Sequence, residues 1–273
     1  MKKLNEKDME FYIINIKLKS NTRKGEEAYY KLFKDLYNKK ELVSVKYGRQ
    51  MILRSCFPYK LNNNKEILYG SITKCIKIED NKWLSLKNLE IINFEIPKDI
   101  FPGAIDLEYY FIPEIHRILI KKSKNSSISQ VMDFLSKSKK NIISIDEDID
   151  IYIEQSQDIF EKIFRSKNLK KLDIEISYTN SDIMNESERM IDNLLKDANI
   201  GKARMKIDPD HNSNLKINSK LLNGLLSIAQ NNGKAEAIII NENDEKEKVI
   251  TEDHPKQIKI KVTPAIANNN LLD

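Results

Sequence analysis

The sequence predicts an α+β protein in which antiparallel sheets carry helices on one face. The C-terminal half provides the clearest evidence, because Leu172, Ile174 and Ile176 alternate with polar residues in the pattern of a half-buried strand. Residues 186–198 then place apolar side chains at helical spacing. Gly and Pro number only 7 each among 273 residues, which disfavours long flexible linkers. Together these observations favour a chain of short strands and amphipathic helices.

The remainder of the C-terminal half extends this pattern. Asn218 is the expected N-cap of the second helix, and Gly233 is the expected residue at its C-terminal end. The resulting order, β-α-β-β-α-β, is the ferredoxin-like arrangement. The expected strands are 172–176, 203–207, 215–217 and 235–241, the expected helices are 186–198 and 219–231, and a further hairpin is expected from 247–251 and 258–262.

The N-terminal half is predicted to be strand-rich and to begin in the same order. Its helix at 25–40 has Glu26 and Glu27 in the first turn and lysines in the last, which suits the helix dipole. The shared opening suggests that the two halves are related, although no sequence repeat supports it. The expected strands are 11–19, 42–54, 66–79, 89–96, 105–111 and 115–121.

Three segments follow from these patterns. The polar stretch at 121–127 is the best candidate for a boundary. We therefore expect a basic, strand-rich half at 1–122 and a ferredoxin-like half at 169–273. A connecting segment at 123–168 is expected to contain helices at 128–138 and 156–166 and a strand at 141–153.

Composition indicates a cytoplasmic protein. The two cysteines, Cys56 and Cys75, are too few for a disulfide scaffold or a cysteine-based zinc site, so free thiols in a reducing compartment are expected. No apolar leader follows Met1, and no stretch approaches the roughly 18 apolar residues of a membrane span. We expect no membrane partner.

Positive charge is concentrated near the N-terminus. Residues 1–60 contain 15 Lys and Arg against 7 Asp and Glu, whereas the rest of the chain is nearly balanced. A basic face of this kind can contact nucleic-acid phosphates, and the alternative is an ordinary solvated lysine-rich surface. The candidate phosphate contacts are Lys17, Lys19, Arg23, Lys24, Lys31 and Lys34.

One histidine lies in a setting that is compatible with RNA cleavage. His116 could act as a general base, with Arg117 on the phosphate and Tyr110 nearby. The alternative is a structural histidine on an alternating strand. These three residues are the catalytic candidates.

The sequence predicts no cofactor and no metal site. Phosphate-loop, dinucleotide-binding, serine-hydrolase and zinc-protease motifs are absent from it. Asp210 and His211 could bind a cation, but the same residues are ordinary turn formers. The acidic run at 146–150 is interpreted as a solvated, charged strand edge.

Several short motifs resemble an uncharacterised bacterial family known as domain of unknown function 4747. These motifs are the opening strand at 11–18, residues 68–72 with Trp83 downstream, residues 110–117, the Gly233 region and residues 251–255. The resemblance spans most of the chain and implies no established activity. Because genes of such families often lie among mobile-element and phage-defence genes, it implies a role in prokaryotic defence.

A looser similarity concerns architecture. Tandem ferredoxin-like halves are similar to the repeat-associated RNA-binding proteins of CRISPR systems. Residues 232–235 contain only Gly233, however, so the glycine-rich C-terminal loop of those proteins is missing.

We therefore expect a binding module of a prokaryotic defence or mobile-element system, contacting nucleic acid, RNA in the first place, or a protein encoded by a neighbouring gene. One alternative is a metal-independent endoribonuclease using His116. Another is a structural or regulatory subunit of a multi-protein defence complex.

Overall fold

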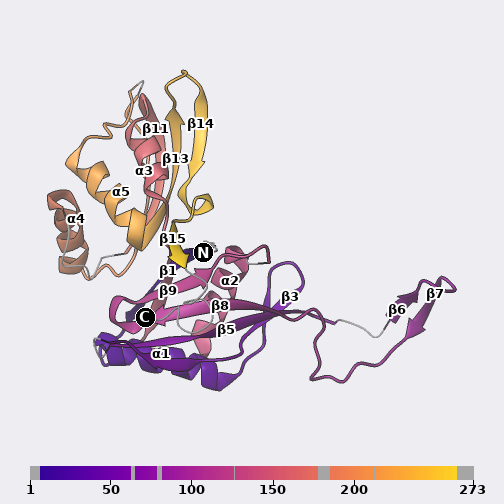
Figure 1. Ribbon diagram of the computed structural model, residues 1–273. Coiled ribbons are helices and arrows are strands. Elements are labelled where there is room, and N and C mark those ends of the chain that lie inside the picture. The colour runs from indigo at the N-terminus through magenta and orange to yellow at the C-terminus, as the bar shows by residue number, and fades with distance from the viewer. Residues whose placement is uncertain are drawn as a thin grey trace, which may run out of the picture. The chain divides into compact units, whose positions relative to one another are not determined.

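The computed structural model describes residues 7–62, 65–78, 82–125, 127–177, 185–211 and 213–262. The chain forms two compact units, and each is assembled from segments that are distant in sequence (Figure 1). Unit 1 contains residues 7–19, 117–119 and the described part of the chain from 148 onward, and unit 2 contains residues 20–116 and 120–147. The division of the chain that the sequence predicts, into segments 1–122, 123–168 and 169–273, stays a prediction.

Unit 2 is a mainly antiparallel sheet that packs against helices. Its strand order is β8-β5-β3-β2, with β4 paired to β5. The elements are α1 (Gly25–Lys39), β2 (Val43–Val45), β3 (Arg49–Leu53), β4 (Phe57–Lys60), β5 (Glu66–Ile76), β6 (Lys82–Ser85), β7 (Glu90–Asn93), β8 (Ile105–Ile112), the short 3-10 helix η1 (Pro113–Ile115), α2 (Ile128–Ser138) and η2 (Lys139–Asn141). Strand β9 (Arg117–Lys121) divides its residues between the two units.

The core of unit 2 forms where α1 meets the sheet. Phe33 on α1 stacks on Phe111 of β8 with ring centroids 4.4 Å apart, and Tyr109 lies 5.2 Å from the same Phe33 ring. These side chains are buried together with Leu68 and Ile72 of β5. The helix at 25–40 and its buried stripe are confirmed, because apolar residues at spacings of three and four positions face one side of a helix.

Unit 1 combines a strand group around β1 with a separate four-stranded sheet. Strand β1 lies between β10 and β9 and pairs with β15 further along its length. The second sheet has the order β12-β11-β13-β14. The elements are β1 (Lys7–Lys19), β10 (Asp148–Ile153), α3 (Gln157–Phe164), β11 (Asn168–Ile176), α4 (Glu186–Asp197), β12 (Ala203–Ile207), α5 (Lys220–Asn232), β13 (Gly233–Ile240), β14 (Lys246–Ile250), η3 (Thr251–Asp253) and β15 (Gln257–Val262).

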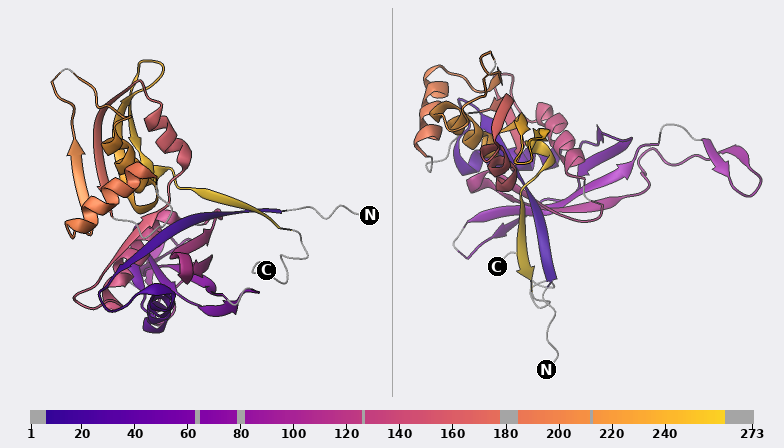
Figure 2. Two further views of the ribbon diagram at one scale, coloured as in Figure 1. Left: turned by 90° about the vertical axis from the view of Figure 1, so that its left-hand side faces the viewer. Right: turned by 90° about the horizontal axis from the view of Figure 1, so that it is seen from above.

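Helices α3, α4 and α5 pack against the four-stranded sheet (Figure 2), and their apolar side chains share one core with it. Leu172 and Ile174 of β11 are buried there beside Leu225 and Leu226 of α5. Alternating residues on β11 face this core, as the sequence pattern predicts. The α+β class is therefore confirmed.

The strand arrangement within this part differs from the expected ferredoxin-like order. The predicted third strand is reduced to a single bridge between Leu215 and Leu169. Leu215 pairs on the same edge of β11 as β12, so the predicted second and third strands lie in line along one edge. Residues 208–211 leave the edge as a polar turn, because Asp208 and Pro209 favour turns over strand pairing.

Three other predicted elements also differ. The strand expected at 42–54 is a hairpin, since Tyr47 and Gly48 have positive φ and reverse the chain. Ser219, rather than Asn218, caps α5 by accepting a hydrogen bond from the Leu222 N–H. The segments at 247–251 and 258–262 do not pair with each other, because β14 pairs with β13 and β15 pairs with β1.

Candidate functional site

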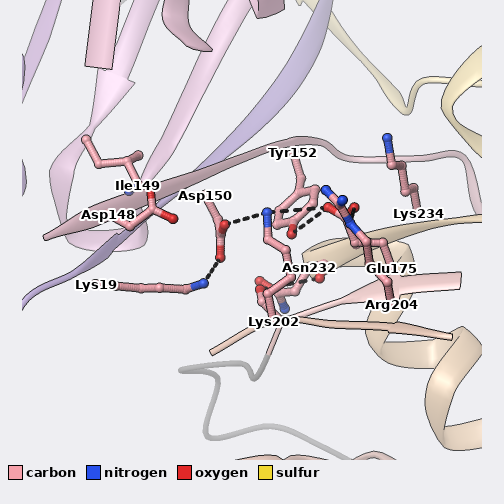
Figure 3. Close-up of polar contacts among 12 residues, drawn as sticks. Lys19, Asp148, Ile149, Asp150, Tyr152, Glu175, Lys202, Arg204, Asn232 and Lys234 are labelled. Atoms are coloured by element: carbon pink, nitrogen blue, oxygen red, sulfur yellow. Dashed lines mark hydrogen bonds and ion pairs between the residues drawn. The ribbon is translucent and has the colours of Figure 1, made fainter. Parts of the chain in front are cut away.

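A network of charged groups around two buried carboxylates occupies unit 1, where β1 and β10 meet groups carried by β11 and β12 (Figure 3). At its centre is Asp150, whose side chain is completely buried. Its carboxylate lies 2.5 Å from Lys19 Nζ and 2.8 Å from Lys202 Nζ. The register of the antiparallel pair places Asp150 directly opposite Lys17. A carboxylate buried this completely stays ionised only where cations surround it.

Glu175 on β11 forms the second half of the network. Its carboxylate accepts a hydrogen bond from Arg204 Nε at 2.5 Å and one from the Tyr152 hydroxyl at 3.3 Å. Lys202 Nζ lies 3.4 Å away, so Lys202 bridges Glu175 and Asp150. Burial, the largest single influence, raises the pKa of Glu175, but the hydrogen bond from Arg204 and the charges of Lys202, Arg204 and Lys234 together outweigh it, so the pKa of Glu175 is lowered. Burial is also the largest single influence on Lys202 and lowers its pKa, but the hydrogen bond to Asp150 and the nearby charges of Asp150 and Glu175 together raise the pKa of Lys202.

Lys17 differs from the other cations of the network because it is almost fully buried. Burial lowers its pKa to about 7, although the attraction of Asp150 opposes this change. The charges acting on it come from three elements: Lys19 on its own strand, Asp150 on β10, and Asp192 with Lys196 on α4. Lys17 is therefore a buried group that changes its protonation near neutral pH.

A second set of amide and ionic contacts joins β1 to the end of α5. Asn15 Nδ2 donates to Asn232 Oδ1 at 2.9 Å, and Asn15 Oδ1 accepts from Arg117 Nη1 at 3.0 Å. Arg117 also forms an ion pair with Glu154. Asn15 and Lys17 point to the same face of β1, since side chains alternate along a strand. This face of β1 is consequently polar although it is buried.

Gly233 allows this close approach of α5 and β13 to β11. A Cβ at this position would lie 2.0 Å from the carbonyl oxygen of Glu175. We expect Gly233→Ala to lower the free energy of unfolding by about 1–3 kcal/mol, because backbone atoms must move to relieve the contact. Urea unfolding measures this loss.

Gly201→Ala is the control, because the nearest neighbour of a Cβ at that position is the flexible end of Lys19. An equal loss of free energy in both variants would contradict the explanation.

The acidic run at 146–150, interpreted from the sequence as a solvated, charged strand edge, is solvated only in part, since Asp146 and Asp148 are exposed. Glu147 and Asp150 are both buried. Glu147 accepts hydrogen bonds from Arg23 Nε at 2.8 Å and Arg23 Nη2 at 2.5 Å, and Arg23 lowers the pKa of Glu147 to about 2. The run therefore anchors two parts of the chain through ion pairs, which its composition alone does not reveal.

The predicted phosphate contacts fall into two groups. Lys17 is buried, Lys19 pairs with Asp150, Arg23 pairs with Glu147, and Lys34 donates to the Cys56 carbonyl. Lys24 and Lys31 are exposed. The role of all six in nucleic-acid binding stays a prediction. Three of them already pair with groups of the protein, and Lys17 is buried within it.

The three catalytic candidates contact different groups. The His116 ring stacks on Tyr29 with centroids 3.7 Å apart and an interplanar angle of 19°. Arg117 instead binds Glu154 and Asn15. Burial raises the pKa of Tyr110 to about 12, which makes this phenol harder to deprotonate than an exposed tyrosine. Their catalytic role stays a prediction.

A polar hollow in unit 2 lies between the last turn of α1 and the segment after η2. Its volume is about 430 Å³, and its lining is Asp35, Asn38, Lys39, Asn141, Ile142, Ile143 and Ser144. Lys40, which is exposed, directly follows Lys39 in the chain. Lys140, which is also exposed, directly precedes Asn141. Amide, hydroxyl and ammonium groups dominate the polar part of this lining, and Asp35 is its one acidic member.

Glu147 holds one wall of this hollow in place. The Ser144 N–H donates to Glu147 Oε2 at 3.0 Å, and Arg23 Nη2 donates to the Ile142 carbonyl at 3.4 Å. Arg23, a predicted phosphate contact, thus shapes the hollow from behind. Asn38, Asn141 and Ser144 were not among the predicted site residues, because isolated polar residues in a loop carry no pattern that assigns them a common site.

Charge is distributed unequally between the units. Among the described residues, unit 1 contains 22 Lys and Arg against 22 Asp and Glu, and unit 2 contains 22 against 14. The positive excess therefore belongs to unit 2, which also contains the hollow. Within the described ranges, no three His, Cys, Asp or Glu side chains come together as a metal site. In the same part of the chain, no helix has both the length and the apolar character needed to cross a membrane.

Comparison with known proteins identifies the family. No curated protein matches the chain. The similarity to CRISPR RNA-binding proteins stays a prediction. The model of the family described as Domain of unknown function (DUF4747) matches residues 7–272, as the short motifs predicted. The chain belongs to this family.

Proposed function

We propose that this protein is a nucleic-acid-binding module that contacts single-stranded RNA at the hollow between α1 and the segment after η2. The observation that carries the proposal is the position of this hollow in the unit with the positive excess. Lys39 belongs to the lining of the hollow, and Lys40 and Lys140 are next to lining residues in the sequence. All three lysines are exposed, and exposed lysines can bind phosphates through release of counterions.

The composition of the hollow favours a single strand over a duplex. A volume of about 430 Å³ falls within the roughly 300–1,000 Å³ of small-ligand pockets. Such a pocket suits one splayed nucleotide, and proteins read unstacked bases through hydrogen bonds to their edges. Asn38 offers an amide donor and an acceptor for that purpose, and Asn141, whose Nδ2 also donates to Glu41 Oε2, offers its second N–H and its carbonyl oxygen. The predicted setting, a prokaryotic defence or mobile-element system, rests on the family resemblance and stays a prediction.

The test is the affinity of the full chain for a fluorescent single-stranded RNA over a series of salt concentrations. In the triple variant Lys39→Glu, Lys40→Glu and Lys140→Glu, we expect the affinity to fall about tenfold or more. The slope of log affinity against log salt should fall by roughly 2, because each phosphate contact to a single strand contributes about 0.7.

A charge-matched control uses exposed lysines of unit 1. The variant Lys170→Glu, Lys206→Glu and Lys216→Glu changes the net charge by the same amount. Equal losses in both triple variants would show attraction by overall charge and not by this surface. The absence of RNA binding by the unmodified chain at low salt would overturn the proposal.

A further inference from the structure

A second feature of unit 2 lies outside the proposed RNA surface. Strands β6 and β7 form a two-stranded sheet, which we call the arm, comprising residues 82–94 (Figure 1). Among the residues that the structure describes, these strands pair only with each other. The chain leaves β5 at Ile76 and returns at Pro102, where the Ile76 N–H donates to the Pro102 carbonyl at 2.9 Å. This hydrogen bond joins the two ends of the chain segment that contains the arm.

The arm has internal contacts that order its open end. The Trp83 indole N–H donates to the Phe94 carbonyl at 3.1 Å. The rings of the same two residues meet edge to face with centroids 6.2 Å apart. An isolated two-stranded hairpin is nevertheless marginally stable in water. Its stability therefore increases when another surface covers it.

Apolar side chains are exposed on both faces of the arm. The register places Trp83 opposite Ile92 on one face, and Leu84 opposite Ile91 on the other. Leu84 is 61% exposed and Ile91 is 73% exposed. At the connecting turn, Leu86 and Leu89 are 82% and 75% exposed. Soluble proteins rarely expose contiguous apolar patches of this kind unless the patch binds a partner.

This distribution of apolar groups restricts the mode of binding. A flat surface would cover one face and leave the other in water. Only insertion into a cleft covers both faces and the turn together. Within the arm, Lys82 and Lys87 are accompanied by Glu90, so it lacks the basic cluster that nucleic acid or an anionic membrane would attract.

The backbone of the arm argues against insertion into lipid. Each strand has one unpaired edge, because only two strands are present in this sheet among the described residues. Open sheet edges do not occur in the hydrocarbon region of a bilayer, where their N–H and C=O groups would lack hydrogen-bond partners. A protein cleft can provide backbone groups that pair with such edges.

A second copy of this chain is a poorer match as the receiving partner. Two hollows among the described residues, one in unit 2 and one beside α3 in unit 1, are lined mainly by charged and amide side chains, so neither offers an apolar cleft to the arm of a second copy. We therefore propose that the arm inserts into an apolar cleft of a different protein and docks this module onto it.

The first experiment places a photo-crosslinking amino acid in the full chain, in the cells that encode it. Positions 84, 91 and 86 sample the two faces and the turn, and position 145, which is fully exposed in unit 2, is the control. We expect all three arm positions to crosslink to one protein other than this chain, and position 145 not to crosslink to it. Crosslinks to a second copy, to lipid, or to no protein would overturn the proposal.

The second experiment uses that crosslinked protein, purified, with the purified full chain. Trp83 is the protein's one tryptophan, so its emission reports burial of the arm directly. We expect the emission to shift to shorter wavelength on binding. We expect the affinity to fall at least about tenfold in Leu84→Ser/Ile91→Ser and to be unchanged in Ile145→Ser.

Controls separate the remaining explanations. Vesicles of phosphatidylcholine and phosphatidylglycerol should leave the Trp83 emission unchanged, and a shift with vesicles would assign the arm to lipid. Circular dichroism of Leu84→Ser/Ile91→Ser should match that of the unmodified chain, because both side chains are exposed. A quadruple variant combines Leu84→Ser and Ile91→Ser with Leu86→Ser and Leu89→Ser. Full affinity of this variant for the crosslinked protein would also overturn the proposal.

Discussion

Replacing Asp150 with asparagine is expected to lower the free energy of unfolding by about 3–5 kcal/mol. The physical reason is the number of cations that depend on this carboxylate. Lys19 and Lys202 contact it directly, and Lys17 lies opposite it in the strand pair. A neutral amide in place of the carboxylate would remove the counter-charge of Lys19 in a largely buried position, and would leave Lys202 with the Glu175 carboxylate at 3.4 Å. Urea unfolding monitored by circular dichroism measures the loss.

Asp148 provides the matched control for this prediction. It lies on the same strand and the same face, two residues before Asp150, but its side chain is exposed. We expect Asp148→Asn to change the free energy of unfolding by less than about 0.5 kcal/mol. If Asp150→Asn caused a loss no greater than this, the network would not stabilise unit 1.

The second large effect concerns Lys17 and depends on pH. Its pKa is lowered from 10.5 to about 7 in the folded protein. Between these pH values the unfolded chain binds more protons than the folded chain, so stability rises with pH across this window. Below pH 7 both states carry the proton, and the cost of burying the charge is fully present. At about 1.36 kcal/mol per pKa unit, that cost is on the order of 5 kcal/mol.

The variant Lys17→Met is therefore expected to be more stable than the unmodified protein at pH 6 by a few kcal/mol. Asp150 keeps Lys19 and Lys202 in this variant, so its charge remains compensated. The advantage should shrink as the pH rises from 7 towards 10.5. Urea unfolding at pH 6, 7.5 and 9 measures it. Exposed Lys24→Met is the control, and an advantage of the Lys17→Met variant that is constant with pH would refute the explanation.

The structure also relates these two predictions to each other. Lys17 costs stability because it is buried, while Asp150 is stabilising because it serves several cations at once. A network of this kind is not a sum of independent pairs. The double variant Lys17→Met/Asp150→Asn is the informative comparison, since a smaller loss caused by Asp150→Asn in the Lys17→Met background than in the unmodified chain measures how much of the loss comes from Lys17.

Periodicity in the sequence was sufficient for the elements that bury one face. The helix at 128–138 was predicted with the bounds that α2 has, and the α1 and α4 predictions differ from the structure by one residue at most. Apolar residues three and four positions apart identify a helix without knowledge of its neighbours. Chain reversals were harder, because Tyr47 adopts the positive φ that the β2–β3 turn needs, and tyrosine is not a typical turn residue.

The candidate sites depended on tertiary structure almost entirely. Lys17 and Lys19 belong to the same alternating face of a predicted strand, and they were interpreted as phosphate contacts. Only the pairing of β1 with β10 brings Asp150 opposite them, and residues more than 180 positions away in sequence, Lys202 among them, complete the network. A charged residue on a strand has the same local pattern whether its face meets water or another part of the chain.

The sequence by itself determined the α+β class, the positions of most helices and strands, the family and the excess of positive charge. The tertiary structure decided which charged residues are buried, which strands are neighbours, and that the apolar residues of the arm remain exposed. The physical reason is that secondary structure follows from short-range spacing and local backbone preference. Burial depends on the partner that covers each face, and that partner comes from a distant part of the chain or, for the arm, from another molecule.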